Sequence, residues 1–229
     1  MNPPQASADR RGASHGDFKG LYAITPDERS TGELARKVAL ALAGGASIVQ
    51  YRSKSADPFL RREQSRALLA LCRASRVPLI VNDDLELAES IGADGLHLGR
   101  EDGPIASARK RLGPAKILGA SCYDDLELAV AARNAGADYV AFGSAFASVT
   151  KPGAVRAPLA LYRDAKASLG CPVVAIGGIT SHNAQALIDA GVDSVAVISA
   201  LFDAEDIEHR AREFAAMFRT HGLEKRSVV

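Results

Sequence analysis

The sequence lacks the features that mark membrane, secreted and polyanion-binding proteins. No apolar run reaches the roughly 18 residues that a membrane-spanning helix requires. The formal net charge is only +1 and the charges are spread along the chain, so no strong field attracts nucleic acid or a membrane surface. The three cysteines, Cys72, Cys122 and Cys171, are odd in number and have no metal-site spacing. They indicate buried thiols in a reducing compartment, so we expect a cytoplasmic protein.

Several catalytic motifs are also missing. The chain contains no HExxH, GxGxxG or P-loop pattern and no Ser-His-Asp spacing. These absences argue against zinc protease, dinucleotide, P-loop nucleotide and serine hydrolase chemistry. Any chemistry must therefore come from another arrangement of side chains.

The two ends of the chain differ in composition from its centre. Residues 1–19 are polar and rich in Pro, Ser, Gly and charge, without the apolar core of a secretory signal. We expect a disordered leader over 1–19 and a loose tail over 221–229, with one folded domain over 20–220 between them. Its 47% content of hydrophobic residues is ample for a packed core.

Between these ends, short apolar runs alternate with longer amphipathic segments, and the alternation repeats eight times. The runs are continuously apolar, which is typical of parallel strands covered by helices. A glycine lies just before a run in each of four similar turns, where the end of a helix needs positive φ: Gly44-Gly45, Gly92, Gly136 and Gly191. The pattern predicts an α/β fold, a single (β/α)8 TIM barrel, with an open doubly wound sheet as the alternative. The expected strands are residues 21–25, 47–52, 79–82, 95–98, 117–121, 139–143, 173–176 and 194–198.

Acidic residues follow two neighbouring strands. Asp83 comes directly after residues 79–82, and Asp102 follows residues 95–98. Because parallel strands end at one edge, these carboxylates can lie together and bind a divalent cation such as Mg²⁺. Asp84 instead fits the N-cap of the next helix, and Glu101 a capping or solvated position.

Cations and backbone-rich loops occur at other strand ends. Arg52, Lys54 and Lys151 follow the second and sixth strands and are suited to phosphate oxygens, although each alone could be a solvated surface charge. Gly177-Gly178 follows the seventh strand and Ile198-Ser199 the eighth, where backbone amides can bind a phosphate monoester. The sequence therefore predicts two anion sites, one of them assisted by a metal. Ser121 either donates to phosphate or packs, and His97 fits a satisfied interior histidine better than a catalyst.

The motifs at these strand ends, taken together and in order, resemble the thiamine phosphate synthase family from residue 20 to residue 202. They are Gln50-Tyr51-Arg52-Ser53-Lys54, Val81-Asn82-Asp83-Asp84, Asp94-Gly95-Leu96-His97-Leu98-Gly99 with Glu101-Asp102, Gly119-Ala120-Ser121, Thr150-Lys151-Pro152, Ile176-Gly177-Gly178-Ile179 and Val197-Ile198-Ser199-Ala200. Members of such a family transfer a hydroxymethylpyrimidine group from its diphosphate to the ring nitrogen of a thiazole phosphate. The products are thiamine phosphate and diphosphate.

The resemblance implies a role for each matched residue, two small-molecule substrates and no nucleophilic side chain. Asp83 and Asp102 are expected to bind Mg²⁺, and Gln50 to read the aminopyrimidine. The diphosphate is assigned to Arg52, Lys54, Asn82, Ser121 and Lys151, of which Arg52, Lys54, Ser121 and Lys151 are expected to act in catalysis by neutralising its charge. The thiazole phosphate is assigned to Gly178, Ile198 and Ser199, with Ser148 and Thr150 over that end of the pocket.

One position departs from the family pattern, and three other functions stay open. Arg100 stands where the family often has Gln, and it can either contact diphosphate or point to solvent. The alternatives are a thiazole tautomerase-like relative, a non-catalytic barrel that binds a phosphorylated metabolite, and a phosphosugar isomerase barrel. The retained acid pair and cations argue against all three. A homo-oligomer is compatible with the sequence.

Overall fold

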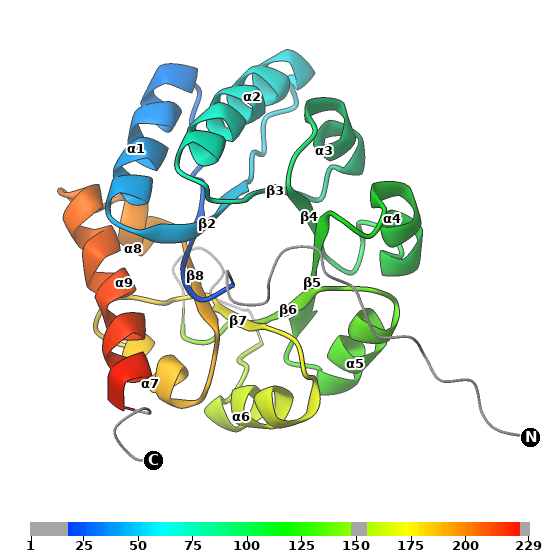
Figure 1. Ribbon diagram of the computed structural model, residues 1–229, viewed down its shortest axis with the longest axis vertical. Coiled ribbons are helices and arrows are strands. Elements are labelled where there is room, and N and C mark those ends of the chain that lie inside the picture. The colour runs from blue at the N-terminus through cyan, green and yellow to red at the C-terminus, as the bar shows by residue number, and fades with distance from the viewer. Residues whose placement is uncertain (1–17, 148–154, 225–229) are drawn as a thin grey trace, which may run out of the picture.

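Eight parallel strands close into a barrel at the centre of the molecule, and the helices surround it (Figure 1). The computed structural model describes residues 18–147 and 155–224. Neighbouring strands pair in sequence order and β8 pairs with β1, which confirms the predicted (β/α)8 barrel over the open sheet. The strands are β1 (Gly20–Ile24), β2 (Ala46–Tyr51), β3 (Leu79–Asn82), β4 (Gly95–Leu98), β5 (Ile117–Tyr123), β6 (Tyr139–Phe142), β7 (Val173–Ile176) and β8 (Ser194–Val197).

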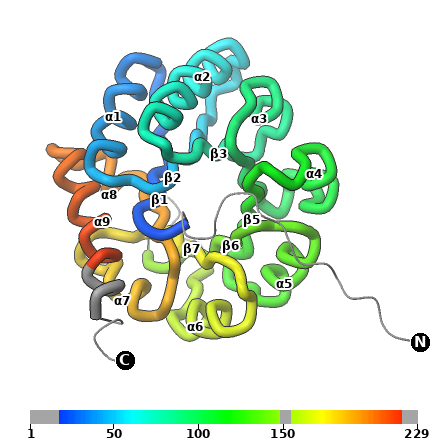
Figure 2. Tube along the Cα trace, in the orientation of Figure 1, coloured from blue at the N-terminus to red at the C-terminus, as the bar shows by residue number. Residues whose placement is uncertain are grey.

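A helix follows every strand, and β8 is followed by two. Figure 2 shows the last of these, α9, beside α1 and α7, where it completes the outer ring. The helices are α1 (Thr31–Ala43), α2 (Pro58–Ala74), α3 (Leu85–Ile91), α4 (Ile105–Leu112), α5 (Leu126–Asn134), α6 (Leu159–Ser168), α7 (Ala184–Asp189), α8 (Ser199–Phe202) and α9 (Ile207–Glu224). Among the described residues, no helix is both long and apolar enough to cross a membrane.

The turns between helices and strands have the predicted backbone. Gly45, Gly92, Gly136 and Gly191 all have positive φ, between +69° and +107°. This conformation lets each helix end and the chain enter the next strand within a few residues. The regular helix-to-strand spacing of the sequence therefore has a local steric cause.

The barrel has two separate apolar layers. The larger one lies between the strands and the helices, and a smaller one fills the barrel interior. Because side chains alternate along a strand, Tyr22 and Ile24 of β1 face inward whereas Leu21 and Ala23 face the helices. The same alternation decides which polar residues of the other strands point into the barrel.

The ordered chain extends beyond the predicted barrel range of 20–220 at both ends. Phe18, which we had placed in the leader, is buried in the barrel interior, with its ring centroid 4.4 Å from that of Tyr139. The α9 helix continues to Glu224, into the range that we had expected to be a loose tail. Phe18 was missed because it is an apolar residue within a polar stretch. The end of α9 was missed because its sequence has no clear stop signal.

Candidate active site

The carboxyl ends of the strands bring Gln50, Asn82 and Ser121 to one end of the barrel. Gln50 pairs with Ile24 of β1 and Ile80 of β3, two residues of the interior layer. Asn82 is paired with His97, and Ser121 with the interior residue Ala141. Strand register thus confirms that these residues share one end of the barrel.

Arg52 lies next to the predicted acid pair. Its backbone N–H donates to Thr25 Oγ1 at 2.9 Å, and the Thr25 hydroxyl donates back to the Arg52 carbonyl at 3.0 Å. Thr25 is fully buried, so this reciprocal pair fixes the chain where it leaves β2. The positive charge of Arg52 is close enough to lower the pKa of Asp83.

Lys54 is held differently from Arg52. We predicted a strand over 47–52, but β2 ends at Tyr51. Arg52 and Lys54 therefore both lie in the loop after the strand. The Lys54 N–H donates to Asp27 Oδ1 at 2.7 Å, and Lys54 Nζ lies 3.8 Å from Asp27 Oδ2. Its side chain is 66% exposed, so the ammonium group is free to move toward a ligand. Asp27 was not singled out from the sequence.

Asp83 and Asp102 face one another at the ends of β3 and β4. Asp83 has a φ of +62°, and its N–H donates to the His97 carbonyl at 2.8 Å. The Gly99 N–H donates to Asp102 Oδ2 at 2.8 Å, and a Cβ at position 99 would come equally close to that oxygen. The left-handed backbone at Asp83 and the missing side chain at Gly99 bring the carboxylates together.

This proximity changes the ionisation of Asp83. Crowding by protein atoms around its carboxyl group, followed by the hydrogen bond and charge of Asp102, raises the pKa of Asp83 to about 6. Asn82 opposes this effect, because its Nδ2 donates to Asp83 Oδ2 at 2.6 Å. Two carboxylates in such contact are stabilised by a cation between them, and their oxygens are the ligands that Mg²⁺ prefers. The donor set therefore fits the expected metal.

Two charged neighbours of the acid pair have roles of their own. Asp84 caps α3 as predicted, accepting from the Leu87 N–H at 2.8 Å, and it also pairs with Arg61 at 2.8 Å. Arg100, whose role the sequence left open, lies with its guanidinium carbon 4.8 Å from the centre of the Tyr123 ring. It makes a cation–π contact there.

The glycine pair after β7 is required by close packing of the chain. Gly177 and Gly178 have φ values of +99° and +64°. A Cβ at Gly178 would lie 2.5 Å from the Ala147 carbonyl oxygen, so the loop after β6 touches this turn. Asn183 Nδ2 donates to the Gly178 carbonyl at 3.0 Å and holds the turn in place. Ile198 and Ser199 lie at the start of α8, at the same end of the barrel.

Three predicted site residues, Ser148, Thr150 and Lys151, lie outside the described residues. Their predicted roles therefore stay predictions.

The interior of the barrel contains a polar network that the sequence analysis missed. Gln50 Nε2 donates to the Tyr22 hydroxyl at 2.9 Å, and the Tyr22 and Tyr139 hydroxyl oxygens are 2.7 Å apart. His97 Nδ1 lies 2.8 Å from the Tyr139 hydroxyl, and His97 Nε2 lies 2.8 Å from Ser121 Oγ. The inward alternation of Tyr22, Tyr139 and His97 in their strands was the available signal.

Burial decides the ionisation of this network. It lowers the pKa of His97 to about 4 and raises those of Tyr22 and Tyr139. All three side chains are therefore neutral at pH 7. His97 is the satisfied interior histidine that we expected, with both ring nitrogens hydrogen-bonded.

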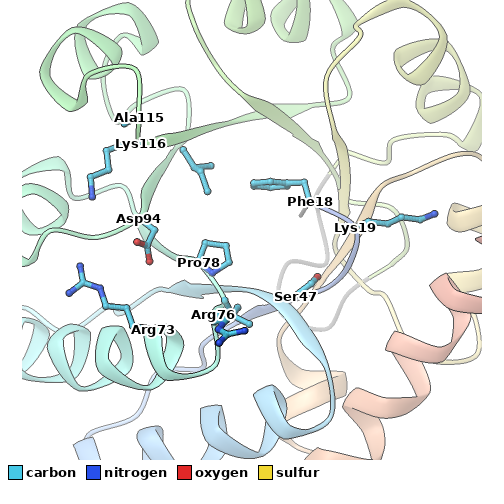
Figure 3. Close-up of a pocket in the computed structure, with 11 residues that line it drawn as sticks. Phe18, Lys19, Ser47, Arg73, Arg76, Pro78, Asp94, Ala115 and Lys116 are labelled. Carbon is cyan, nitrogen blue, oxygen red and sulfur yellow. The ribbon is translucent and has the colours of Figure 1, made fainter. Parts of the chain in front are cut away.

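A cavity of about 720 Å³ lies at the opposite, amino-terminal end of the barrel (Figure 3). Figure 3 shows Asp94 between Arg73 and Lys116, with the Phe18 ring projecting into the space. Arg73 and Lys116 donate to the carbonyls of Gly92 and Ala93, so they hold a turn of the chain. This cavity is separate from the strand ends that carry the predicted site.

Comparison with known proteins agrees with this geometry. The sequence model of the thiamine monophosphate synthase family matches residues 21–201. The chain is 57% identical over 199 residues to thiamine-phosphate synthase of Thiobacillus denitrificans, covering 87% of this chain and 94% of that protein. It is 56% identical over 201 residues to the enzyme of Methylobacillus flagellatus, covering 88% and 96% of the two chains.

A solved structure is similar over the whole barrel. Thiamine phosphate pyrophosphorylase from Pyrococcus furiosus matches with a TM-score of 0.80 and 36% identity, covering 90% of this chain and 98% of that chain. The matched residues include every strand end that carries the predicted site in the described chain. The chain therefore belongs to the thiamine monophosphate synthase family and is an enzyme of thiamine biosynthesis.

Proposed function

We propose that the enzyme is a Mg²⁺-dependent transferase acting on 4-amino-2-methyl-5-hydroxymethylpyrimidine diphosphate and 4-methyl-5-(2-phosphooxyethyl)thiazole. The products are thiamine phosphate and diphosphate. The observation that carries the proposal is the contact between Asp83 and Asp102, with Arg52 beside them, at the carboxyl ends of the strands. In such a site, two carboxylates can bind a metal ion, and the metal ion and the arginine can bind the same anionic group.

Asp83 and Asp102 are the proposed ligands of Mg²⁺. Within the described residues, no group of three or more His, Cys, Asp or Glu is placed to hold a metal ion. A two-carboxylate site suits Mg²⁺, which commonly keeps several waters and takes further oxygens from a phosphorylated substrate. Bound there, the ion would supply positive charge against the diphosphate leaving group.

The side chains around the acid pair neutralise the leaving diphosphate. Arg52 offers a planar fork and Lys54 a mobile point charge, and Asn82 and Ser121 add neutral donors. As the bond to diphosphate breaks, negative charge grows on the leaving oxygens and positive charge on the pyrimidine methylene. Donors fixed in advance around the leaving group stabilise this charge separation. Lys151 is proposed to contribute from the loop after β6.

The two organic groups are proposed to bind on either side of this diphosphate site. Gln50 hydrogen-bonds the aminopyrimidine from the end of β2. The thiazole phosphate lies against the turn at Gly178 and the start of α8 at Ile198 and Ser199. Ser148 and Thr150 are the proposed polar contacts above that phosphate. The thiazole nitrogen then attacks the pyrimidine methylene, so no side chain needs to act as a nucleophile.

The proposed setting is the cytoplasm. Cys72, Cys122 and Cys171 are all buried and unpaired, which suits a reducing compartment. The partners that the reaction requires are small molecules. A homo-oligomer is compatible with this function and would be measured by light scattering.

The test is a direct assay of the purified protein. It is incubated with the pyrimidine diphosphate, the thiazole phosphate and Mg²⁺, and the product is oxidised to fluorescent thiochrome. We expect fluorescence that depends on both substrates and disappears with EDTA. Absence of product from protein shown to be folded by circular dichroism would refute the proposal. Product in the presence of EDTA would refute the role of the metal and leave the proposed transfer reaction standing.

A further inference from the structure

A buried chain of polar side chains joins the two ends of the proposed pyrimidine diphosphate site. It runs from Gln50 through Tyr22, Tyr139 and His97 to Ser121, with contacts of 2.9, 2.7, 2.8 and 2.8 Å. Tyr22 and Tyr139 are only 1% and 0% exposed, so the middle of the chain is sealed from water. Gln50 and Ser121 themselves lie at the strand ends.

The Gln50 hydrogen bond sets the donor direction for the rest of this chain. Because Gln50 Nε2 donates to Tyr22, the Tyr22 proton is available to the Tyr139 oxygen, and the Tyr139 proton to His97 Nδ1. A neutral imidazole that accepts at Nδ1 carries its proton on Nε2. His97 then donates to Ser121 Oγ, and the Ser121 proton is left to donate to a ligand.

Only one other arrangement satisfies every member. If the Gln50 amide turns over, its oxygen accepts from Tyr22 and each later bond reverses, so that Ser121 donates to His97. A mixture of the two directions leaves either a buried hydroxyl proton without an acceptor or two facing oxygens without a proton between them, because the Tyr22 hydroxyl bonds only Gln50 and Tyr139 in the described part of the chain. Such an unsatisfied group carries its full desolvation penalty. The chain therefore behaves as a unit with two states.

We propose that Tyr22, Tyr139 and His97 are positioning residues that link the orientation of the Gln50 amide to the donor direction of Ser121. The inference rests on the proposed function. In the state in which Gln50 donates to Tyr22, Gln50 keeps its oxygen for the exocyclic amine of the pyrimidine while Ser121 donates to the diphosphate. In the reversed state, Gln50 offers N–H to the pyrimidine and Ser121 no longer donates outward. Recognition of an amine at one end thus sets the diphosphate contact at the other.

The test compares the natural aminopyrimidine diphosphate with an analogue that has an oxo group in place of the amine. The measured quantity is the ratio of the two kcat/KM values, or of inhibition constants if the analogue is not turned over. It is measured for the wild type, Tyr22→Phe, Ser121→Ala and the control Tyr162→Phe. Tyr162 is also a buried tyrosine, but its hydroxyl donates to the Phe142 carbonyl and takes no part in the chain.

We expect the preference for the amine to fall roughly tenfold, about 1.4 kcal/mol, in both Tyr22→Phe and Ser121→Ala. Tyr162→Phe should keep the wild-type preference. The Ser121→Ala result is decisive because the chain connects Ser121 to Gln50 only through other side chains. If Gln50 recognises the amine independently of Ser121, Ser121→Ala lowers the kcat/KM values of the natural substrate and the oxo analogue equally. Their ratio then stays at the wild-type value, which would overturn the inference. Tyr139→Phe replaces Tyr22→Phe if that variant does not fold.

A second measurement does not depend on the reaction. In protein labelled with ¹⁵N-histidine, nuclear magnetic resonance reports which nitrogen of His97 carries the proton, and His97→Asn assigns the signal. We expect the proton on Nε2, and a proton on Nδ1 in the free enzyme would overturn the direction of the chain. If the wild type is active but Tyr22→Phe and Ser121→Ala keep its preference for the amine, the inference is refuted and the proposed function is not. An inactive wild type refutes the proposed function, and the His97 signal then decides the direction of the chain.

Discussion

Tyr139 occupies the space that a side chain at Gly119 would fill. The two residues are paired across β5 and β6, and a Cβ at position 119 would lie 2.0 Å from Tyr139 Cζ and 2.4 Å from its hydroxyl oxygen. The glycine therefore lets the phenol cross the barrel interior and reach His97. A large residue on one strand is matched by the smallest residue on its neighbour.

Gly119→Ala is expected to displace Tyr139 and break its contact with His97. Overpacking a filled core usually costs about 1–3 kcal/mol in unfolding free energy, and the buried hydroxyls lose their partners as well. Urea unfolding measures this loss. Gly32→Ala is the matched control, because Gly32 is exposed in α1 and a Cβ there meets nothing closer than 3.9 Å. It should be neutral or stabilising, and equal losses in both variants would contradict the packing argument.

Asp102→Asn should separate binding of the metal from folding. The variant removes the repulsion that raises the pKa of Asp83, while its amide oxygen can still accept from the Gly99 N–H. We expect unchanged or higher stability without metal and a loss of Mg²⁺-dependent activity of at least about a hundredfold, the usual scale of such electrostatic terms. Urea unfolding and a Mg²⁺ titration of the thiochrome assay measure the two effects.

The control for this variant is Asp84→Asn, which changes the neighbouring acid. Asp84 caps α3 and pairs with Arg61, so its loss should lower stability and leave the Mg²⁺ dependence intact. Wild-type activity in Asp102→Asn at every Mg²⁺ concentration would remove the metal assignment.

The sequence predicted those parts of the fold that have local causes. The glycine turns at Gly92 and Gly136 follow from backbone sterics, and the continuous apolar runs follow from burial on both faces of the sheet. The acid pair was also predictable, because parallel strands must end at the same edge. What could not be predicted is the contact between Tyr22 and Tyr139, which are 117 positions apart in the sequence. Only barrel closure brings them together, and no local pattern specifies it.

The approach of Asp27 to Lys54 has the same origin. Asp27 lies in the loop after β1 and Lys54 in the loop after β2, and neither loop has a regular period from which side-chain direction can be inferred. Sequence reasoning therefore placed Lys54 after the second strand, and it singled out neither Asp27 nor the contact between the two residues. The positions of Ser148, Thr150 and Lys151 stay predictions for the residues that the structure does not describe.

The stability of the metal-free protein should fall on acidification through the titration of His97. Its pKa is about 4 in the folded protein and 6.5 ordinarily, so between these pH values the unfolded chain binds a proton that the folded protein does not. This contribution is present above pH 6.5 and is lost as the pH falls to about 4, which amounts to about 3 kcal/mol. Asp83 acts in the opposite direction, because its raised pKa lets the folded protein bind a proton first.

Comparison of variants isolates the contribution of His97 to the pH dependence of stability. His97→Asn should be less stable than the wild type at pH 7, but its stability should fall less steeply between pH 6.5 and 4. His182→Asn, at an exposed position, should retain the wild-type slope. Unfolding in urea at several pH values provides the curves. Identical slopes for His97→Asn and the wild type would show that the buried imidazole is not the source.

Phe18→Ala tests whether the packed barrel begins before β1. Phe18 is 6% exposed and its ring lies against Tyr139, so truncation opens a cavity beneath the polar network. Buried phenylalanine-to-alanine changes cost about 3–5 kcal/mol in unfolding free energy, and we expect the lower end of this range because Phe18 borders the open cavity at the amino-terminal end. Phe59→Ala is the control, since Phe59 is 82% exposed and its loss should change little. If Phe18→Ala is as stable as the wild type, Phe18 does not contribute to the packed barrel and belongs with the leader.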